Sequence, residues 1–171
     1  MITCCLNFTD EQPPDTNMDK FWQICQMICA WNDHMAEFFH AAWVVCLDEL
    51  MSIWHSKWTC PGWVFCPRKP HPFGNEYHSA CCGLSTIMFV IEMVEGKDAP
   101  SLLCWPFNAL GKTVGLLLQM LQSYFGTGRY ILLDSGFCVL KAITELKRNG
   151  LFGCVMIKKK CYWPAHVKGD E

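Results

Sequence analysis

The sequence predicts an α/β domain in which a mixed β-sheet carries helices on its faces. Two observations indicate this class. Segments with apolar residues every three or four positions alternate with short, β-branched apolar runs, in the order helix, several strands, helix, strand, helix, strand. In addition, 51% of the 171 residues are hydrophobic and 18% are charged, a composition that supplies one buried core and excludes a mostly disordered chain.

The N-terminal half is expected to contain one helix and several strands. Apolar residues recur at helical spacing over residues 18–39, which predicts an amphipathic helix. The apolar run at residues 42–47 predicts a buried strand that ends at Asp48. Residues 63–66 predict a short strand, and residues 76–93 predict extended structure with a turn in its middle.

The C-terminal half places a second acid, Asp134, directly after an apolar strand, as Asp48 is placed in the first half. A Ser-Gly turn follows this acid, and the next helix is stopped by Asn149 and Gly150. The predicted elements are a connection at 95–107, a helix at 110–125, a strand at 129–133, a helix at 137–148 and a last strand at 151–157.

The two aspartates are the candidate catalytic and metal-binding residues. Acids at the carboxyl ends of neighbouring strands can share divalent metal ions, which activate a water or hydroxyl and stabilise the leaving oxygen in phosphoryl transfer. The alternative is that Asp48 caps a turn and Asp134 caps the helix that follows it. Spacing alone does not separate these two interpretations.

Three segments carry motifs: residues 46–52 are C-L-D-E-L-M-S, residues 67–77 are P-R-K-P-H-P-F-G-N-E-Y, and residues 131–137 are I-L-L-D-S-G-F. Together they resemble the piggyBac transposase family. Residues 46–52 are similar to the signature in which an Asp-Glu pair ends the first strand of the catalytic sheet. Residues 67–77 match its K-P-x-x-x-G segment. Residues 131–137 look like its second strand and acid, although Ser135 and Gly136 replace the usual Asn-aromatic pair.

The resemblance implies a ribonuclease H-like fold and DNA transposition at a TTAA target. Asp48 and Asp134 match two of the family's three acids, which hold Mg²⁺ (or Mn²⁺). The third acid follows a long insertion beyond the last strand seen here, so we expect a catalytic domain truncated at its C-terminal side and inactive as this fragment. Alternatives are a non-catalytic DNA- or protein-binding module that keeps the fold, and an unrelated globular interaction protein.

DNA is the expected partner, and the net charge of −2 requires that local basic patches bind it. The candidate patches could also be ordinary solvated charge clusters. Lys158 reaches the acids only if the last strand runs parallel to theirs. The nucleic-acid-binding candidates are Arg68, Lys69, Lys158, Lys159 and Lys160.

The domain boundaries expected from the sequence are a lead-in at 1–16, a transposase-like catalytic domain at 17–163 and a tail at 164–171. No run reaches the roughly 18 apolar residues of a membrane span, and no signal peptide is visible, so an intracellular location without membrane contact is expected. The resemblance implies a nuclear location. A homo-oligomer would form through missing regions. No zinc is expected, because no cysteine and histidine spacing fits a usual zinc pattern.

Overall fold

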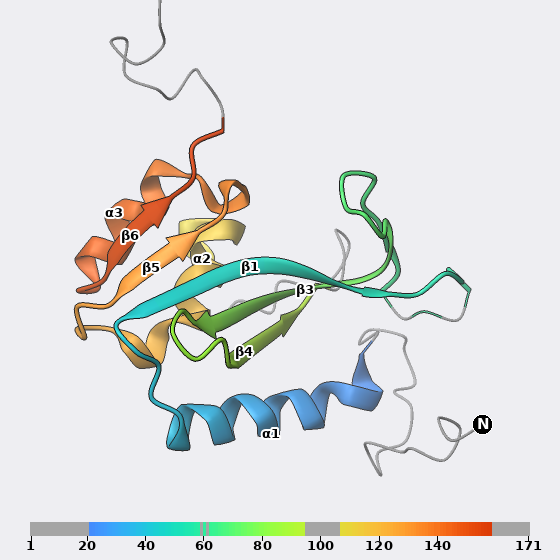
Figure 1. Ribbon diagram of the computed structural model, residues 1–171, viewed down its shortest axis with the longest axis horizontal. Helices are drawn as coiled ribbons and strands as arrows, with labels where there is room; N and C mark the ends of the chain where they lie inside the picture. Colours follow the sequence, from blue (N-terminus) through green and yellow to red (C-terminus); the bar gives the residue numbers. More distant parts are fainter. Residues whose placement is uncertain (1–20, 59, 61, 95–106, 159–171) are drawn as a thin grey trace, which may run out of the picture. The chain divides into compact units, whose positions relative to one another are not determined.

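The computed structural model describes residues 21–58, 60, 62–94 and 107–158, and it confirms a mixed α/β architecture (Figure 1). Two compact units contain these residues. Of the described residues, those within 21–40, 48–82 and 86–94 belong to unit 1, and those within 41–47, 83–85 and 107–158 belong to unit 2. The strands are β1 (Val44–Ile53), β2 (Val64–Phe65), β3 (Phe73–Cys82), β4 (Met88–Met93), β5 (Tyr130–Leu133) and β6 (Phe152–Val155). The α-helices are α1 (Trp22–Phe38), α2 (Lys112–Met120) and α3 (Leu140–Arg148).

Hydrogen-bonded strands follow the order β2-β3-β1-β5-β6, and β4 also pairs with β3. β1 contributes residues to both units, since its part up to Leu47 belongs to unit 2 and the rest to unit 1. β1 pairs parallel with β5, and β5 pairs parallel with β6. β3 pairs antiparallel with β2 and β4. The sheet is therefore mixed, as the sequence predicts.

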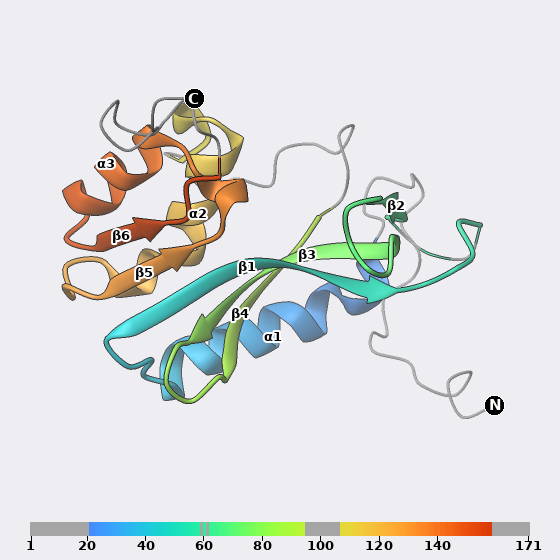
Figure 2. The same ribbon diagram turned by 45° about the horizontal axis from the view of Figure 1, so that its top comes forward.

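Unit 1 is held together by a helix that is hydrogen-bonded to a strand. α1 contacts β4, and it runs alongside that strand in both ribbon views (Figures 1 and 2). The side-chain amide of Asn32 donates to the carbonyl of Ile91 and accepts from its N–H, both at 2.9 Å. This amide imitates a neighbouring peptide group and satisfies backbone groups of β4. Met35 and Phe89 are buried in this unit.

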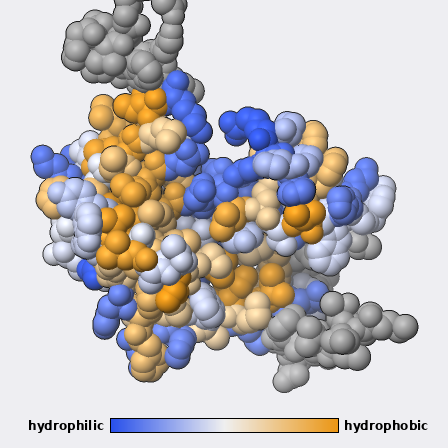
Figure 3. All heavy atoms as spheres, viewed as in Figure 1, coloured by the Kyte–Doolittle hydropathy of each residue, from blue (hydrophilic) through white to orange (hydrophobic). Residues whose placement is uncertain are grey.

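Unit 2 has one buried and one exposed sheet face. Successive strand residues point to opposite faces, and the buried set is Val45, Leu47, Ile131 and Leu133. α3 packs on β6, where a Cβ on Gly153 would lie 2.6 Å from the side chain of Ile143. On the opposite face the rings of Tyr130 and Phe152 stack at 5.3 Å, and apolar side chains show as orange spheres over β5 and β6 (Figure 3). Exposed residues of these strands include Tyr130, Leu132 and Phe152.

α3 ends in the capping pattern that Asn149 and Gly150 predict. Gly150 has a φ of 71°, its N–H donates to Lys147, and the N–H of Leu151 donates to Leu146 at 2.9 Å. These two bonds form a Schellman motif, in which two last carbonyls of the helix are satisfied. Leu146 and Leu151 are both buried, which supplies the apolar contact that accompanies the motif.

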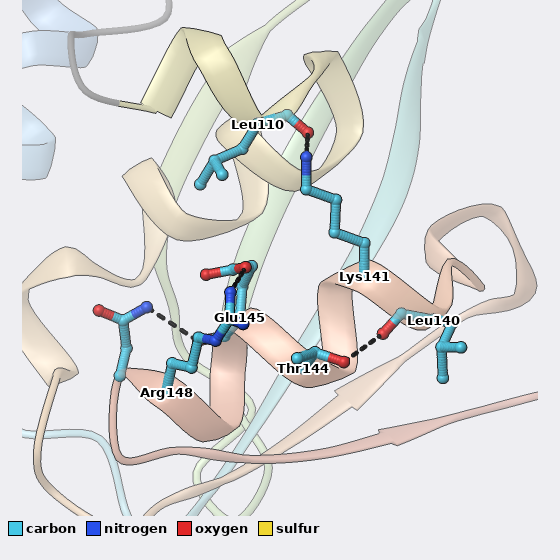
Figure 4. Close-up of polar contacts among 7 residues, drawn as sticks. Leu110, Leu140, Lys141, Thr144, Glu145 and Arg148 are labelled. Carbon is cyan, nitrogen blue, oxygen red and sulfur yellow. Dashed lines mark hydrogen bonds and ion pairs between the residues drawn. The ribbon is translucent and has the colours of Figure 1, made fainter.

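Side chains of α3 form hydrogen bonds within the helix and to Leu110, which lies just before α2 in the chain (Figure 4). Lys141 donates to the carbonyl of Leu110 at 3.0 Å, and the hydroxyl of Thr144 donates to Leu140. Glu145 is buried and pairs with Arg148 one turn later. The ion pair compensates the burial of this carboxylate.

Several predicted boundaries are wrong. β1 does not end at Leu47 but continues to Ile53, because its backbone remains hydrogen-bonded to β3 as far as the bond from Trp54 N to Phe73 O at 3.1 Å. The helix predicted at 110–125 is shorter in the structure, where it corresponds to α2. The 3₁₀ turn η2 (Phe107–Leu110) precedes α2, and the 3₁₀ turn η3 (Gln122–Tyr124) follows it. Gly111, between η2 and α2, has a φ of 92°, which interrupts the helical backbone there. The helix predicted from residue 137 begins at Leu140, after the 3₁₀ turn η4 (Ser135–Phe137). The expected domain boundaries at 16 and 163 lie outside the described residues.

Cys154 stands among apolar residues in the sequence but is exposed, since it alternates with Gly153 and points away from α3. Among the cysteines that the structure describes, Cys60 and Cys82 are buried. No helix in the described part of the chain has the length and hydrophobicity needed to cross a membrane.

Arg129 fixes the approach to the parallel strands of unit 2. Its guanidinium donates through Nε and Nη2 to the carbonyl of Ala41, at 3.1 and 2.8 Å, and through Nε to that of Ala42. Its Cζ atom also lies 4.8 Å from the centroid of the Tyr124 ring. The hydroxyl of Tyr124 accepts a hydrogen bond from the N–H of Ala41 at 3.4 Å. One planar group therefore joins the start of β5, the segment before β1 and the turn after α2.

We expect Arg129→Lys to destabilise the protein by about 1 to 3 kcal/mol, because a single ammonium cannot reproduce the forked donation and leaves a buried carbonyl without a partner. Urea denaturation monitored by circular dichroism measures this change. Lys141→Ala is the control, because it removes one exposed hydrogen bond and should cost about 0.5 kcal/mol or less. Equal effects of the two substitutions would contradict the role given to Arg129.

Candidate functional site

Asp134 stands immediately after β5, as the sequence predicts. Its side chain is 43% exposed. The pKa of this carboxyl group lies below its usual value, chiefly because the backbone N–H of Ser135 donates to it, with a further contribution from the Lys158 ammonium. The hydroxyl of Ser135 also donates to Oδ2 at 3.4 Å. The carboxylate is therefore charged at neutral pH and turned partly toward solvent.

Asp134 does not cap the helix that follows it. α3 begins six residues later in the chain, after Val139, and neither η4 nor α3 has a capping bond from the side chain before it. The interpretation of Asp134 as a helix cap is therefore wrong. Its carboxylate is left to interact with charged groups at the end of the sheet.

Lys158 is brought to Asp134 by the direction of β6. The register pairs Leu133 with Val155 in parallel strands, so the chain leaves both strands at the same edge of the sheet. The Nζ atom of Lys158 lies 3.4 Å from Oδ1 of Asp134. The last strand therefore runs parallel to β5, which is the direction that Lys158 needs in order to reach Asp134. The ammonium of Lys158 and the carboxylate of Asp134 form an ion pair in unit 2.

Asp48 lies within β1 and is exposed. It follows Leu47, and Leu47 is the last residue of β1 that pairs with β5, where its partner is Leu133. Oδ1 of Asp48 accepts a hydrogen bond from the N–H of Glu49 at 2.8 Å. Asp48 therefore does not cap a turn, because the strand continues on both sides of it.

Glu49 has a set of partners that the sequence does not reveal. His78, on β3, lies 4.0 Å from Oε1 of Glu49. The ammonium of Lys69 donates to the backbone carbonyl of Glu49 at 2.7 Å. The pKa of Glu76 is raised, first by burial and then by the charge of Glu49, while Lys69 and Arg68 oppose the shift. This polar cluster lies in unit 1 on β1, β3 and the turn before β3.

The raised pKa of Glu76 gives a pH dependence. The folded protein holds this proton more tightly than the unfolded chain, so the contribution to stability is complete below the unfolded value of 4.5 and is lost as pH rises through the higher folded value. We expect Glu76→Gln to be more stable than the parent at about pH 7 and to lose this advantage at about pH 4. Chemical denaturation at both pH values measures it.

The exposed Glu37 of α1 offers a control, since Glu37→Gln also removes one negative charge. A pH-independent difference between Glu76→Gln and the parent would contradict the assignment of the destabilising charge to Glu76.

The remaining nucleic-acid candidates have different surroundings. Arg68 is exposed at the turn between β2 and β3, whereas Lys69 is engaged with Glu49. Lys159 and Lys160 lie outside the described residues. Gly74, which belongs to the K-P-x-x-x-G segment, has a φ of 150°, and a Cβ there would lie 1.8 Å from the carbonyl oxygen of Ser52. Only glycine allows this close approach of β3 to β1.

Within the residues that the structure describes, no three His, Cys, Asp or Glu side chains gather in a way that could hold a metal ion. Asp48, in unit 1, and Asp134, in unit 2, each offer one carboxylate. Mg²⁺ is commonly held by one or two carboxylates and completes its octahedron with water and substrate phosphates. The oxygen donors of the two aspartates, both accessible to solvent, fit this metal class.

The mixed sheet and its helices form a ribonuclease H-like fold. The structure resembles one chain of the "Cryo-EM structure of piggyBac transposase synaptic complex with hairpin DNA (SNHP)", with a TM-score of 0.77 and 17% sequence identity over 99% of this chain. The chain spans 35% of the length of that transposase chain. No curated protein matches the sequence.

The family described as Transposase IS4 matches residues 1–170, and the chain belongs to this family. The resemblance to piggyBac transposases that the three segments predict is confirmed at the level of the fold.

Proposed function

We propose that this chain carries part of a metal-dependent site for DNA strand cleavage and transfer, with Asp48 and Asp134 as ligands of Mg²⁺ or Mn²⁺. The observation that supports it is the parallel register of β1 and β5. Leu47 pairs with Leu133, and each of these two residues is followed in the chain by one of the two aspartates. Residues that follow a pair in parallel strands continue in the same direction, so both acids leave the pairing at one edge.

Each residue has a separate task in the proposed reaction. A bound divalent ion would activate the attacking oxygen and stabilise the leaving oxygen. Asp134 contributes a carboxylate whose lowered pKa keeps it charged. The N–H and hydroxyl groups of Ser135 hold that carboxylate in place. Lys158 neutralises it when no other cation is present, and it can contact a DNA phosphate once the carboxylate binds a metal.

DNA is the proposed partner of this chain, and the nucleus is the proposed location of a protein with this activity. The solved transposase is named as a synaptic complex with hairpin DNA. Arg68, Lys69 and Lys158 are the described cations proposed to contact phosphates, and Lys159 and Lys160 continue the basic run beside Lys158. Homo-oligomer formation remains a prediction.

A second candidate function is a DNA- or protein-binding module that keeps the fold without the chemistry. The observation that favours it is the small number of acidic ligands. The part of the chain that the structure describes offers no third ligand near a pair of acids. Metal binding and strand cleavage separate this candidate from the first one.

The metal proposal predicts that Mn²⁺ binds the protein and that Asp48→Asn and Asp134→Asn each weaken the binding by about tenfold or more, because each removes a charged oxygen ligand. Isothermal titration calorimetry measures the affinity. Asp33→Asn, which removes an exposed carboxylate from α1, should leave the affinity unchanged. Unchanged binding in both site variants would exclude this metal site.

Lys158 gives a more specific prediction, because its ammonium and a metal ion compete for the same carboxylate. Lys158→Gln should bind Mn²⁺ more tightly by about two- to fivefold, which is the range expected for an exposed ion pair. Lys141→Gln, a change of the same kind on α3, should have no effect on the affinity. Weaker Mn²⁺ binding in Lys158→Gln would show that the lysine supports the metal site instead of competing with it.

A further inference from the structure

A continuous part of unit 1 has a composition unlike the rest of the chain. Residues 50–75 contain no Asp or Glu, although the whole chain has 16 acids and a net charge of −2. The same residues include the cations Lys57, Arg68 and Lys69. They also include five aromatic residues, which are Trp54, Trp58, Trp63, Phe65 and Phe73. Here we call these five residues the aromatic platform.

Strand pairing aligns part of this platform. The register of β2 and β3 places Phe65 opposite Phe73, and their rings stack at 5.1 Å with 24° between their planes. The ring of Trp63 stacks on Phe73 at 5.8 Å and 21°. The N–H of Trp54 donates to the carbonyl of Phe73 at 3.1 Å, so the backbone after β1 lies next to this strand pair. The rings of Trp63, Phe65 and Phe73 therefore form one stacked group.

The platform is turned toward solvent to an unusual degree for large apolar residues. Trp58 is 85% exposed, and Phe65 is 55% exposed. Trp54 and Phe73 are also exposed. Phe65 and Phe73 are both exposed and stack on each other, and exposed aromatic side chains in contact commonly mark a site of interaction.

Cations are interleaved with these rings. The ammonium of Lys57 lies over the ring of Trp58 at 4.6 Å from its centroid. Arg68 is exposed in the turn between β2 and β3, where the N–H of Lys69 donates to the carbonyl of Cys66. Exposed rings and cations in a segment that has no acids of its own are complementary to a polyanion that presents flat apolar groups.

We propose that the aromatic platform binds unpaired nucleotides of a DNA strand, with bases stacked on Trp58 and Phe65 and phosphates near Lys57 and Arg68. In duplex DNA the base faces are stacked on each other and are not available to protein rings, whereas a single strand exposes them. The surface therefore favours unpaired over paired DNA. This inference rests on the proposed function only in taking DNA as the partner, since it requires neither metal nor strand cleavage.

The exposed rings of β5 and β6 provide an internal comparison. Tyr130 and Phe152 stack and are about as exposed as Phe65, but their sheet face in unit 2 has apolar neighbours such as Leu132 and Met156. β5 and β6 themselves contain no Lys or Arg, so the segments that carry this second pair lack charges that attract phosphates. It is the matched control for a loss of exposed aromatic area.

The test is fluorescence anisotropy with the whole chain in the presence of EDTA. The probe is a fluorescein-labelled oligodeoxythymidine of about 12 nucleotides, compared with a duplex of the same length. We expect the single strand to bind more tightly than the duplex, and Trp58→Ala and Phe65→Ala each to weaken its binding by about tenfold. Arg68→Gln should reduce the slope of log affinity against log salt by about one.

Phe152→Ala should leave the affinity for the single strand unchanged. Because Trp58 is almost fully exposed, Trp58→Ala should retain the circular dichroism spectrum of the parent, which separates lost binding from lost folding. The proposal is overturned if the duplex binds as tightly as the single strand, if Trp58→Ala binds like the parent, or if Phe152→Ala loses as much affinity as Trp58→Ala. Since EDTA removes divalent ions, failure here leaves the metal proposal standing, and failure to bind Mn²⁺ leaves this one standing.

Discussion

The parallel pairing of β1 with β5 is the constraint on which the proposed chemistry depends. Its register joins Leu47 to Leu133, and each of these residues precedes an aspartate. A slip of one residue would turn the side chains of one strand to the opposite face and would separate the two acids. The buried positions Val45 and Ile131 oppose such a slip, because it would expose them. The core thus determines the direction of the polar residues at the edge.

The direction of β6 likewise places a cation beside Asp134. As β6 is parallel to β5, the chain beyond it arrives at the carboxyl end of β5, where Lys158 contacts Asp134. An exposed ion pair of this kind adds little to stability. Its proposed consequence is functional, since a metal ion could displace the lysine from the carboxylate and the released lysine could contact a DNA phosphate. In unit 1 the ammonium of Lys57 lies over the ring of Trp58, and Arg68 is exposed in the same acid-free segment.

Local signals in the sequence predict local features well. Asn149 and Gly150 indicate the end of α3, and the apolar run before Asp134 indicates β5, because capping and strand formation depend on nearby residues. The extension of β1 to Ile53 was missed because it depends on β3, a strand some twenty residues away. The contact between Glu49 and His78 was missed for the same reason. The resemblance of three segments to piggyBac transposases identified the fold, while the positions of the side chains required the strand register.

The central claim is that both aspartates bind one divalent cation. Anomalous diffraction from crystals soaked in MnCl₂ tests it most directly, because the signal of manganese locates the ion without any assumption about activity. The account predicts an anomalous peak with carboxylate oxygens of Asp48 and Asp134 at about 2.0 to 2.2 Å, the range for hard divalent ions of this size. A peak bound by other residues, or two aspartates turned to opposite faces of the sheet around no common ion, would contradict it.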